Sequence, residues 1–111
     1  MLKEAVNIDK IGQEIADYLS AYIRIDKIIV YGSYAYGEPR EDSDIDIAVV
    51  SDNFREMSIL EKIELLSKVS LAIDSRIEVK GFTRREYDHA SAGSLVSLIR
   101  QKGKEITHIP I

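Results

Sequence analysis

The sequence predicts a single α/β (α+β) domain, in which helices flank a small mixed β-sheet. Its 111 residues match the usual length of one domain and suffice to bury one hydrophobic core. Segments with helical periodicity alternate with short β-branched or alternating segments, a pattern typical of helices packed on a sheet. We find no repeat, low-complexity tract or linker, so we expect residues 1–111 to form one unit.

The first half of the chain predicts one helix and two strands separated by a loop. Residues 8–23 place apolar side chains at helical spacing, and an asparagine or aspartate near their start can cap the helix. The β-branched run KIIVY at 27–31 ends at a glycine and predicts a buried strand. Residues 32–43 are rich in turn formers, whereas DIDIAVV at 44–50 alternates acidic and aliphatic residues. The latter segment predicts a strand that begins with one polar face.

The second half predicts three helices and two strands. Ser58 and Glu61 have the spacing of a capping box and start the first of these helices. Residues 76–82 alternate as a strand, and a second capping-box pair directly after them starts a short helix. Residues 95–101 predict the last helix, and 105–109 an edge strand. The apolar stripe of the helix after Ser58 is predicted to consist of Ile59, Ile63, Leu66, Val69 and Ile73.

The most informative stretch is GSYAYGEPREDSDID at 32–46. Side chains two residues apart in a strand leave the same face, so Asp44 and Asp46 point in one direction. Two carboxylates held that close repel each other unless a cation lies between them, and oxygen ligands suit Mg²⁺ or Mn²⁺. Gly32 allows a backbone to approach phosphate closely, and Ser33 offers a hydroxyl at the start of a helical turn. Together these residues predict a site for a metal ion and a nucleoside triphosphate.

Two other interpretations of this stretch fail on particular residues. A calcium loop beginning at the first aspartate would need glycine where Ile47 stands and glutamate where Asn53 stands. A Walker A loop would need lysine and serine or threonine after Gly37, where the chain has glutamate and proline. A solvent-facing strand edge remains the structural alternative for the two aspartates.

Charge and composition limit the possible partners and locations. The net charge of −4 argues against bulk DNA binding. Residues 1–75 contain 8 Lys and Arg against 15 Asp and Glu, whereas residues 76–111 contain 7 against 4. The basic segment is either a solvated face or a docking face for an acidic or phosphate-bearing partner. No cysteine, membrane-spanning run or signal-peptide pattern occurs, so we expect a cytoplasmic protein that does not enter a membrane.

The motif resembles the signature of the DNA polymerase beta-like nucleotidyltransferase superfamily. Gly32 and Ser33 are followed by Asp44 and Asp46 within SDIDI, and the short chain resembles the minimal, MNT-type branch that is encoded beside HEPN-domain toxins. The resemblance implies the polymerase beta-like nucleotidyltransferase fold. It also implies Mg²⁺-dependent transfer of a nucleoside monophosphate, AMP from ATP, to a hydroxyl with release of pyrophosphate.

The resemblance also implies a role for each site residue. Asp44 and Asp46 would hold Mg²⁺, or Mn²⁺ in its place, and Gly32 and Ser33 would hold the triphosphate. A third carboxylate on a neighbouring strand would complete the metal site and help to activate the acceptor hydroxyl. Glu78 is the best match, because alternation along 76–82 places it on a polar face. Asp74 is the rival, at the junction of a helix and a strand.

The acceptor is implied only by the branch that the chain resembles. It would be a tyrosine hydroxyl of a HEPN-domain toxin, so that the protein acts as an antitoxin within a homo- or hetero-oligomer. Its docking face would be the basic segment, with Arg84, Arg85 and Arg100. Three tyrosines beside the motif would either stack on the base or pack at the loop, namely Tyr31, Tyr34 and Tyr36.

Two departures from the family pattern keep other functions open. Relatives more often carry aspartate at the position of Glu78, and many have arginine at the position of Tyr36. Both differences favour a non-catalytic module that neutralises its partner by binding alone. A nucleotidyltransferase with a small-molecule acceptor, such as an aminoglycoside, is a third possibility because the pocket would be acidic.

Overall fold

The computed structural model describes residues 6–40 and 43–106. Its four strands form one sheet in the order β3-β2-β1-β4. The central pair β1–β2 and the pair β1–β4 are antiparallel, whereas β2 and β3 are parallel. The strands are Lys27–Tyr31 (β1), Ile45–Val50 (β2), Ile77–Phe82 (β3) and Lys104–Glu105 (β4). The predicted small mixed sheet is therefore confirmed.

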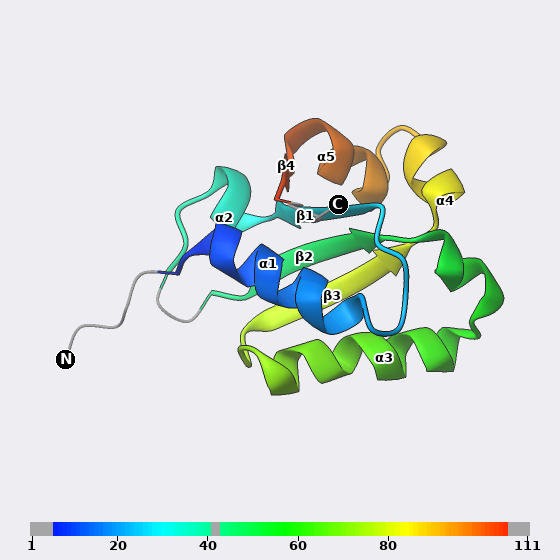
Figure 1. Ribbon diagram of the computed structural model, residues 1–111. Helices are drawn as coiled ribbons and strands as arrows, with labels where there is room; N and C mark the ends of the chain where they lie inside the picture. Colours follow the sequence, from blue (N-terminus) through cyan, green and yellow to red (C-terminus); the bar gives the residue numbers. More distant parts are fainter. Residues whose placement is uncertain (1–5, 41–42, 107–111) are drawn as a thin grey trace.

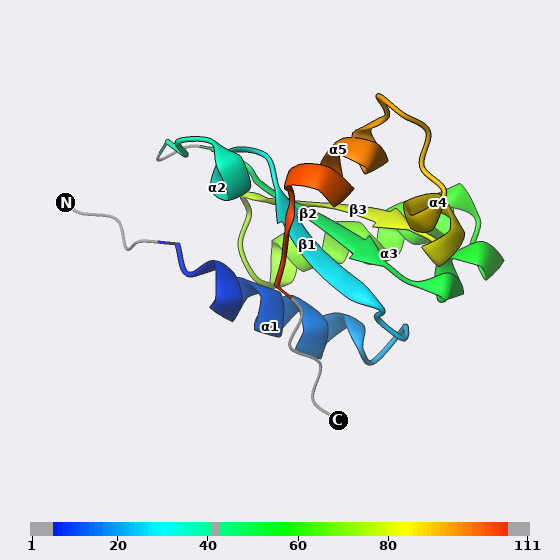
Figure 2. The same ribbon diagram turned by 90° about the horizontal axis from the view of Figure 1, so that it is seen from above.

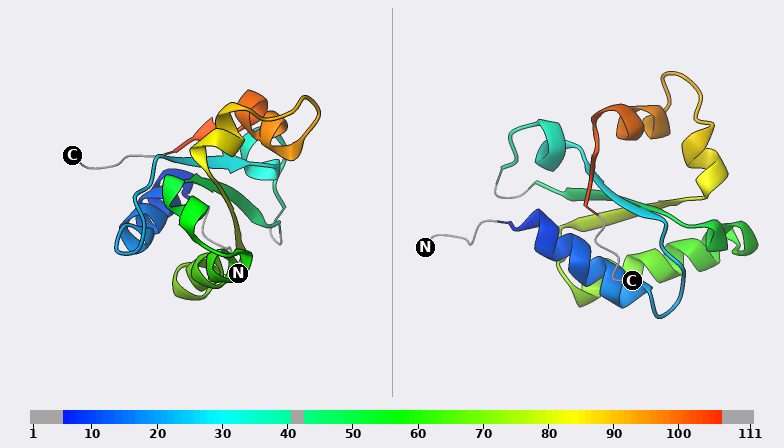
Figure 3. Two further views of the ribbon diagram at one scale, coloured as in Figure 1. Left: turned by 90° about the vertical axis from the view of Figure 1, so that its right-hand side faces the viewer. Right: turned by 45° about the horizontal axis from the view of Figure 1, so that its top comes forward.

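Helices cover both faces of the sheet (Figure 1). The helices are Ile8–Leu19 (α1), Ser33–Tyr36 (α2), Ile59–Ala72 (α3), Arg84–Asp88 (α4) and Leu95–Lys102 (α5), with a 3₁₀ helix at Asp52–Glu56 (η1). α1 and α3 lie on one side of the sheet, and α4 and α5 lie on the other (Figure 3). None of the helices in the described part is long and apolar enough to cross a membrane.

The two faces of the sheet bury two groups of apolar side chains. The larger group lies between the sheet and α1 and α3, and Ile15, Leu19 and Val69 are its innermost helical members. The smaller group packs Ile99 of α5 against Tyr31 and other residues of β1 and β2. Seen from above, α4 lies at one end of the strands, α2 lies beyond the other, and α5 lies between them (Figure 2). This second face is therefore covered only in part.

Capping residues were predicted correctly at the helices that begin with a capping box. The side chain of Ser58 accepts from the N–H of Glu61 at 3.1 Å, and Glu61 accepts from the N–H of Ser58 at 3.0 Å. The same reciprocal pair starts α4 at Thr83 and Glu86. These signals are local, since both partners lie within one turn of helix.

Two predicted boundaries and part of one predicted apolar stripe differ from the structure. The first helix ends at Leu19 rather than at residue 23, because the chain turns there to bury Ile23 and Ile25. The edge strand predicted at 105–109 is Lys104–Glu105, and residues 107–109 lie outside the described residues. The predicted apolar stripe of α3 is wrong at two positions, because Ile59 and Ile63 are 74% and 56% exposed. α3 packs against β3, the last strand of the sheet, so no strand lies beyond it to cover them.

Candidate active site

One row of side chains crosses three adjacent strands. Tyr31 of β1 lies opposite Asp46 of β2, and Asp46 lies opposite Glu78 of β3. Residues paired across strands point to the same face of a sheet, so the three side chains share the face that α4 and α5 cover. α4 begins just after Phe82, at the other end of that face, whereas Ile99 of α5 packs in the apolar cluster that includes Tyr31. The carboxylates in the row remain accessible, since Asp46 is half-buried and Glu78 is exposed.

The turn after β1 brings Gly32 against Asp46. Gly32 has φ +73°, a conformation that glycine adopts without strain. A Cβ atom added at Gly32 would collide with Oδ2 of Asp46. Glycine is therefore required here both by the backbone and by the carboxylate beside it. Ser33 follows as the first residue of α2, and its hydroxyl has no hydrogen-bond partner among the described residues.

Asp44 precedes the first residue of β2 and is exposed. It lies two residues before Asp46, so alternation places both carboxylates on one face. The loop before it is held by the N–H of Arg40, which donates to the Ser43 hydroxyl at 2.7 Å. The structure thus gathers Gly32, Ser33 and the two aspartates at one end of the central strands, as their spacing predicted.

Electrostatic repulsion is concentrated at Asp46. Burial raises the pKa of this carboxyl, and the negative charges of Glu78 and Asp44 raise it further. Lys80 acts in the opposite direction on the pKa of Asp46. Its Nζ lies 3.1 Å from Oε1 of Glu78. The site therefore favours additional positive charge, of which Lys80 supplies a part.

Tyr31, for which the sequence allowed either stacking on a base or packing at the loop, packs in the smaller apolar cluster and carries a buried hydroxyl. The residue is 5% exposed, and its hydroxyl has no hydrogen-bond partner among the described residues. Burial, followed by the charges of Asp46 and Glu78, raises its pKa, so the phenol stays protonated and can donate. The sequence feature that could have indicated a place for Tyr31 in the site is its position at the end of β1, directly before Gly32.

The carboxylates of Asp44, Asp46 and Glu78 are of the donor type that fits a divalent cation, but that of Glu78 is engaged in an ion pair. No group of three or more acidic or histidine side chains in the described ranges is placed to hold a metal ion. The predicted trio of Asp44, Asp46 and Glu78 is thus not assembled, and the ion pair holds Glu78 to Lys80. Carboxylate oxygens are nevertheless the ligands that Mg²⁺ prefers, and a cation would relieve the repulsion that raises the pKa of Asp46.

Asp74, the rival third carboxylate, is committed to another partner. It accepts hydrogen bonds from Nε and Nη2 of Arg76 at 3.1 and 2.9 Å, and from the Arg76 backbone N–H at 2.9 Å. These bonds hold the turn between α3 and β3 and lower the pKa of Asp74. The geometry therefore favours Glu78 over Asp74 as the neighbour of Asp46.

Comparisons with known proteins identify the family to which the strands of this site belong. Residues 13–106 match the family model described as Polymerase beta, Nucleotidyltransferase. MJ0604 of Methanocaldococcus jannaschii, by name a protein adenylyltransferase, is 37% identical over 75 residues, which cover 66% of this chain and 75% of that protein.

Solved structures of toxin–antitoxin complexes have the same fold. A crystal structure of a toxin–antitoxin with AMP-PNP matches with a TM-score of 0.66 and 26% identity, over 88% of this chain and 73% of that chain. A tri-AMPylated Shewanella oneidensis HEPN toxin in complex with MNT antitoxin matches with a TM-score of 0.60 and 23% identity, over 90% and 71%. The match of the family model spans the Gly32 turn and all three strands of the row, and the chain belongs to the polymerase beta nucleotidyltransferase family.

Proposed function

We propose that this nucleotidyltransferase moves AMP from ATP to a tyrosine hydroxyl of a HEPN-domain toxin, with Mg²⁺, and so acts as an antitoxin. The observation that carries the proposal is the row itself, in which Asp46 lies beside Glu78 and against the Gly32 turn. This arrangement places oxygen donors for a cation next to a backbone that can approach a triphosphate closely.

Each residue has a defined role in the proposed reaction. Asp44, Asp46 and Glu78 would hold the cation, which when bound neutralises charge on the phosphates. Gly32 and Ser33 would contact the triphosphate. The acceptor oxygen attacks the α-phosphorus, the bond to the β-phosphate oxygen breaks, and pyrophosphate leaves.

Glu78 is also suited to accept the proton of the acceptor hydroxyl. It is exposed at the open end of the row, where a group on another molecule can reach it. Its ion pair with Lys80 must open for either task, and an exposed pair of this kind holds its partners weakly.

The acceptor class is supported by the relatives. The names and titles of the similar proteins describe a protein adenylyltransferase, a complex with AMP-PNP and an AMPylated HEPN toxin bound to an MNT antitoxin. The accessible Glu78 agrees with an acceptor that is a second protein.

The test is transfer of labelled AMP to the HEPN-domain protein, co-expressed and purified with this chain. With α-labelled ATP and Mg²⁺, we expect the partner to gain the mass of one or more AMP groups. Asp46→Asn should slow transfer by on the order of 100-fold. Asp17→Asn is the matched control, because Asp17 is exposed on α1, on the opposite side of the sheet. Equal rates for the two variants would contradict the assigned roles.

A non-catalytic antitoxin is the second candidate, favoured by the Glu78–Lys80 ion pair that keeps one carboxylate engaged. The double variant Asp44→Asn, Asp46→Asn separates the two functions. A catalytic antitoxin loses its protective effect on cells that express the toxin, whereas a pure binding module retains it.

A further inference from the structure

β3 is an edge strand with unpaired backbone groups. The carbonyls of Arg76 and Phe82 accept from N–H groups that lead into and out of β2, at 2.9 Å each. Because backbone groups alternate in direction along a strand, Ile77, Val79 and Gly81 turn theirs to the free edge. The N–H of Ile77 donates to Asp74 at 3.0 Å, and Nζ of Lys62 donates to the carbonyl of Gly81 at 3.0 Å.

Four backbone groups remain along this edge without a partner among the described residues. They are the carbonyl of Ile77, both groups of Val79 and the N–H of Gly81. An added strand satisfies such groups in one step, since it presents matching donors and acceptors at the same spacing.

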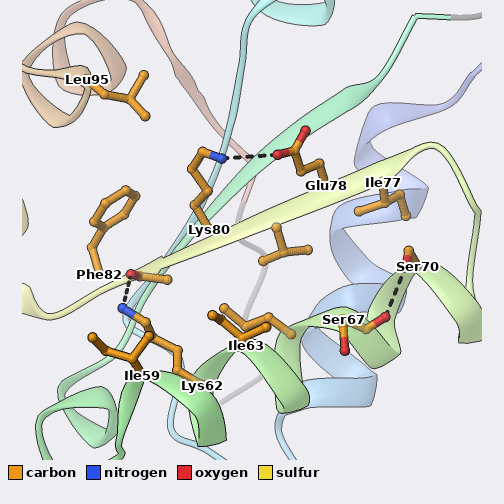
Figure 4. A pocket seen from close by; sticks show the side chains of 13 residues that line it. Ile59, Lys62, Ile63, Ser67, Ser70, Ile77, Glu78, Lys80, Phe82 and Leu95 are labelled. Atoms are coloured by element: carbon orange, nitrogen blue, oxygen red, sulfur yellow. Dashed lines mark hydrogen bonds and ion pairs between the residues drawn. The ribbon is translucent and has the colours of Figure 1, made fainter.

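A groove of about 560 Å³ runs along the same edge. Ile59 and Ile63 of α3 form one wall, and Phe82 and Leu95 form the other (Figure 4). Ile59 and Ile63 are 74% and 56% exposed, although a soluble helix normally turns such residues inward. α3 therefore offers apolar surface for one more strand than the sheet contains.

The groove reaches the proposed active site. Glu78 lines it together with Lys80, and Figure 4 shows their ion pair above the strand. A chain lying along β3 would thus pass the carboxylate that lies opposite Asp46.

A second copy of this chain does not suit the edge. Its own α3 would come to the same face, over a strand roughly 4.8 Å from β3. Packed helices need axes about 8–10 Å apart. An extended segment without a helix of its own meets no such obstacle.

We propose that the edge of β3 binds an extended segment of the acceptor protein as a fifth strand, with apolar side chains at alternate positions against Ile59 and Ile63. The inference rests on the proposed function for the identity of that protein, the HEPN-domain toxin. The added strand would hold the acceptor beside Glu78.

Residue-resolved hydrogen exchange tests the added strand directly. In the free protein, we expect rapid exchange at the amides of Val79 and Gly81 and slow exchange at Glu78 and Lys80, which face β2. Binding of the HEPN-domain protein should slow exchange at Val79 and Gly81 by at least tenfold. Unchanged exchange at these two amides in the complex would overturn the proposal, as would their protection in a self-associated free chain.

A pair of variants of α3 tests the apolar wall. Ile63→Lys should weaken the complex by about tenfold or more, the loss expected when one buried aliphatic contact is removed. Leu71→Lys is the matched control, since Leu71 is 87% exposed on α3 and does not line the groove. Equal affinities for the two variants would count against the groove.

The same experiments separate this inference from the proposed function. A complex with protected Val79 and Gly81 but no AMP on the partner would retain the fifth strand and reject the transfer. AMP transfer without protection at these amides would retain the transfer and reject the fifth strand. Absence of any complex would reject the HEPN-domain protein as the occupant.

Discussion

The buried hydroxyl of Tyr31 lowers the stability of the fold unless a ligand binds it. An unsatisfied buried donor costs about 1–3 kcal/mol, and Tyr31 has no partner among the described residues. We therefore expect Tyr31→Phe to leave the free energy of unfolding unchanged or to raise it by about 1 kcal/mol. The same change should slow AMP transfer by roughly tenfold, because one donor beside Asp46 is lost. Thermal unfolding and initial rates measure the two effects.

Tyr18→Phe provides the comparison for Tyr31→Phe. Tyr18 is half-buried on α1 and packs against Tyr22 with ring centroids 5.9 Å apart, on the side of the sheet away from the row. We expect Tyr18→Phe to leave the rate of AMP transfer unchanged. A Tyr31→Phe protein that is clearly less stable than the wild type would show that the hydroxyl has a partner in the fold.

At Gly32, as at Tyr31, we expect the addition or removal of one atom to change AMP transfer. Gly32→Ala introduces a Cβ that meets Oδ2 of Asp46 and also strains a positive φ. Gly93→Ala is a matched control, because Gly93 has φ +82° but nothing within 4 Å of an added Cβ. Strain alone should reduce the free energy of unfolding of both variants by about 1 kcal/mol. Only Gly32→Ala should also abolish AMP transfer, measured as incorporation of label.

Loss of transfer in both glycine variants would point to unfolding rather than to the carboxylate. Retained transfer in Gly32→Ala would show that Asp46 can move away without consequence. Either result would remove the close approach of Gly32 and Asp46 from the proposed site.

At the scale of elements, Asp74 joins the end of α3 to β3. Its pKa is lowered in the folded protein, first by the hydrogen bonds from the Arg76 side chain and then by the backbone bond. Such a carboxylate stabilises the fold above its unfolded pKa of about 3.9. The contribution is lost as pH falls through the lower folded value.

Asp74→Asn should therefore reduce the free energy of unfolding by about 1 kcal/mol at pH 7. The difference from the wild type should shrink as the pH falls below about 4, because the unfolded wild type then binds a proton at Asp74 while the folded carboxyl, with its lowered pKa, still resists it. Urea unfolding at pH 7 and at pH 3 measures it. A difference of equal size at both pH values would mean that the charge of Asp74 contributes nothing.

Local signals made most of the elements predictable. Capping boxes at Ser58 and Thr83, and the β-branched run of β1, depend on neighbours within a few residues. The end of α1 and the exposure of Ile59 were not predictable, since both depend on which elements pack together. Strand order is likewise a tertiary property, and it is what leaves α3 overhanging an edge.

In the candidate site, too, local sequence patterns predicted some features, and others needed the tertiary structure. Period-two alternation predicted that Asp44 and Asp46 share a face. Glu78 was the best match to a third carboxylate that the family resemblance implies, and alternation placed it on the polar face of its strand. Their register across β2 and β3 needed the structure, as did the ion pair between Glu78 and Lys80. The unpartnered hydroxyl of Tyr31 was not predictable, because a missing hydrogen bond has no counterpart in the sequence.

At the scale of the whole molecule, the basic segment contributes less free charge than its composition suggests. Arg84 lies 3.9 Å from Asp26 and 3.8 Å from Asp88. Arg100 donates to the backbone carbonyl of Asp88 at 3.0 Å and lies 5.5 Å from the ring centroid of Tyr87. Both side chains thus contact other residues of this chain. Of the three predicted docking arginines, Arg85 alone has neither an ion pair nor a side-chain hydrogen bond nor a ring contact within the described ranges.

Arg85 should therefore account for most of the electrostatic attraction to an acidic partner. Arg85→Glu is expected to slow association with the HEPN-domain protein several-fold at low salt, with a smaller effect at 0.5 M salt, where screening is strong. Arg84→Glu should instead lower the thermal stability, because it replaces attraction to two aspartates by repulsion. Association rates measured over a salt series, beside thermal unfolding of each variant, separate docking from folding.

α4 directly follows β3 in the chain (Figure 1), so an acceptor guided by Arg85 would arrive at the end of the groove. An association rate unchanged by Arg85→Glu at low salt would remove the basic segment from the docking face and leave the apolar edge of β3 alone.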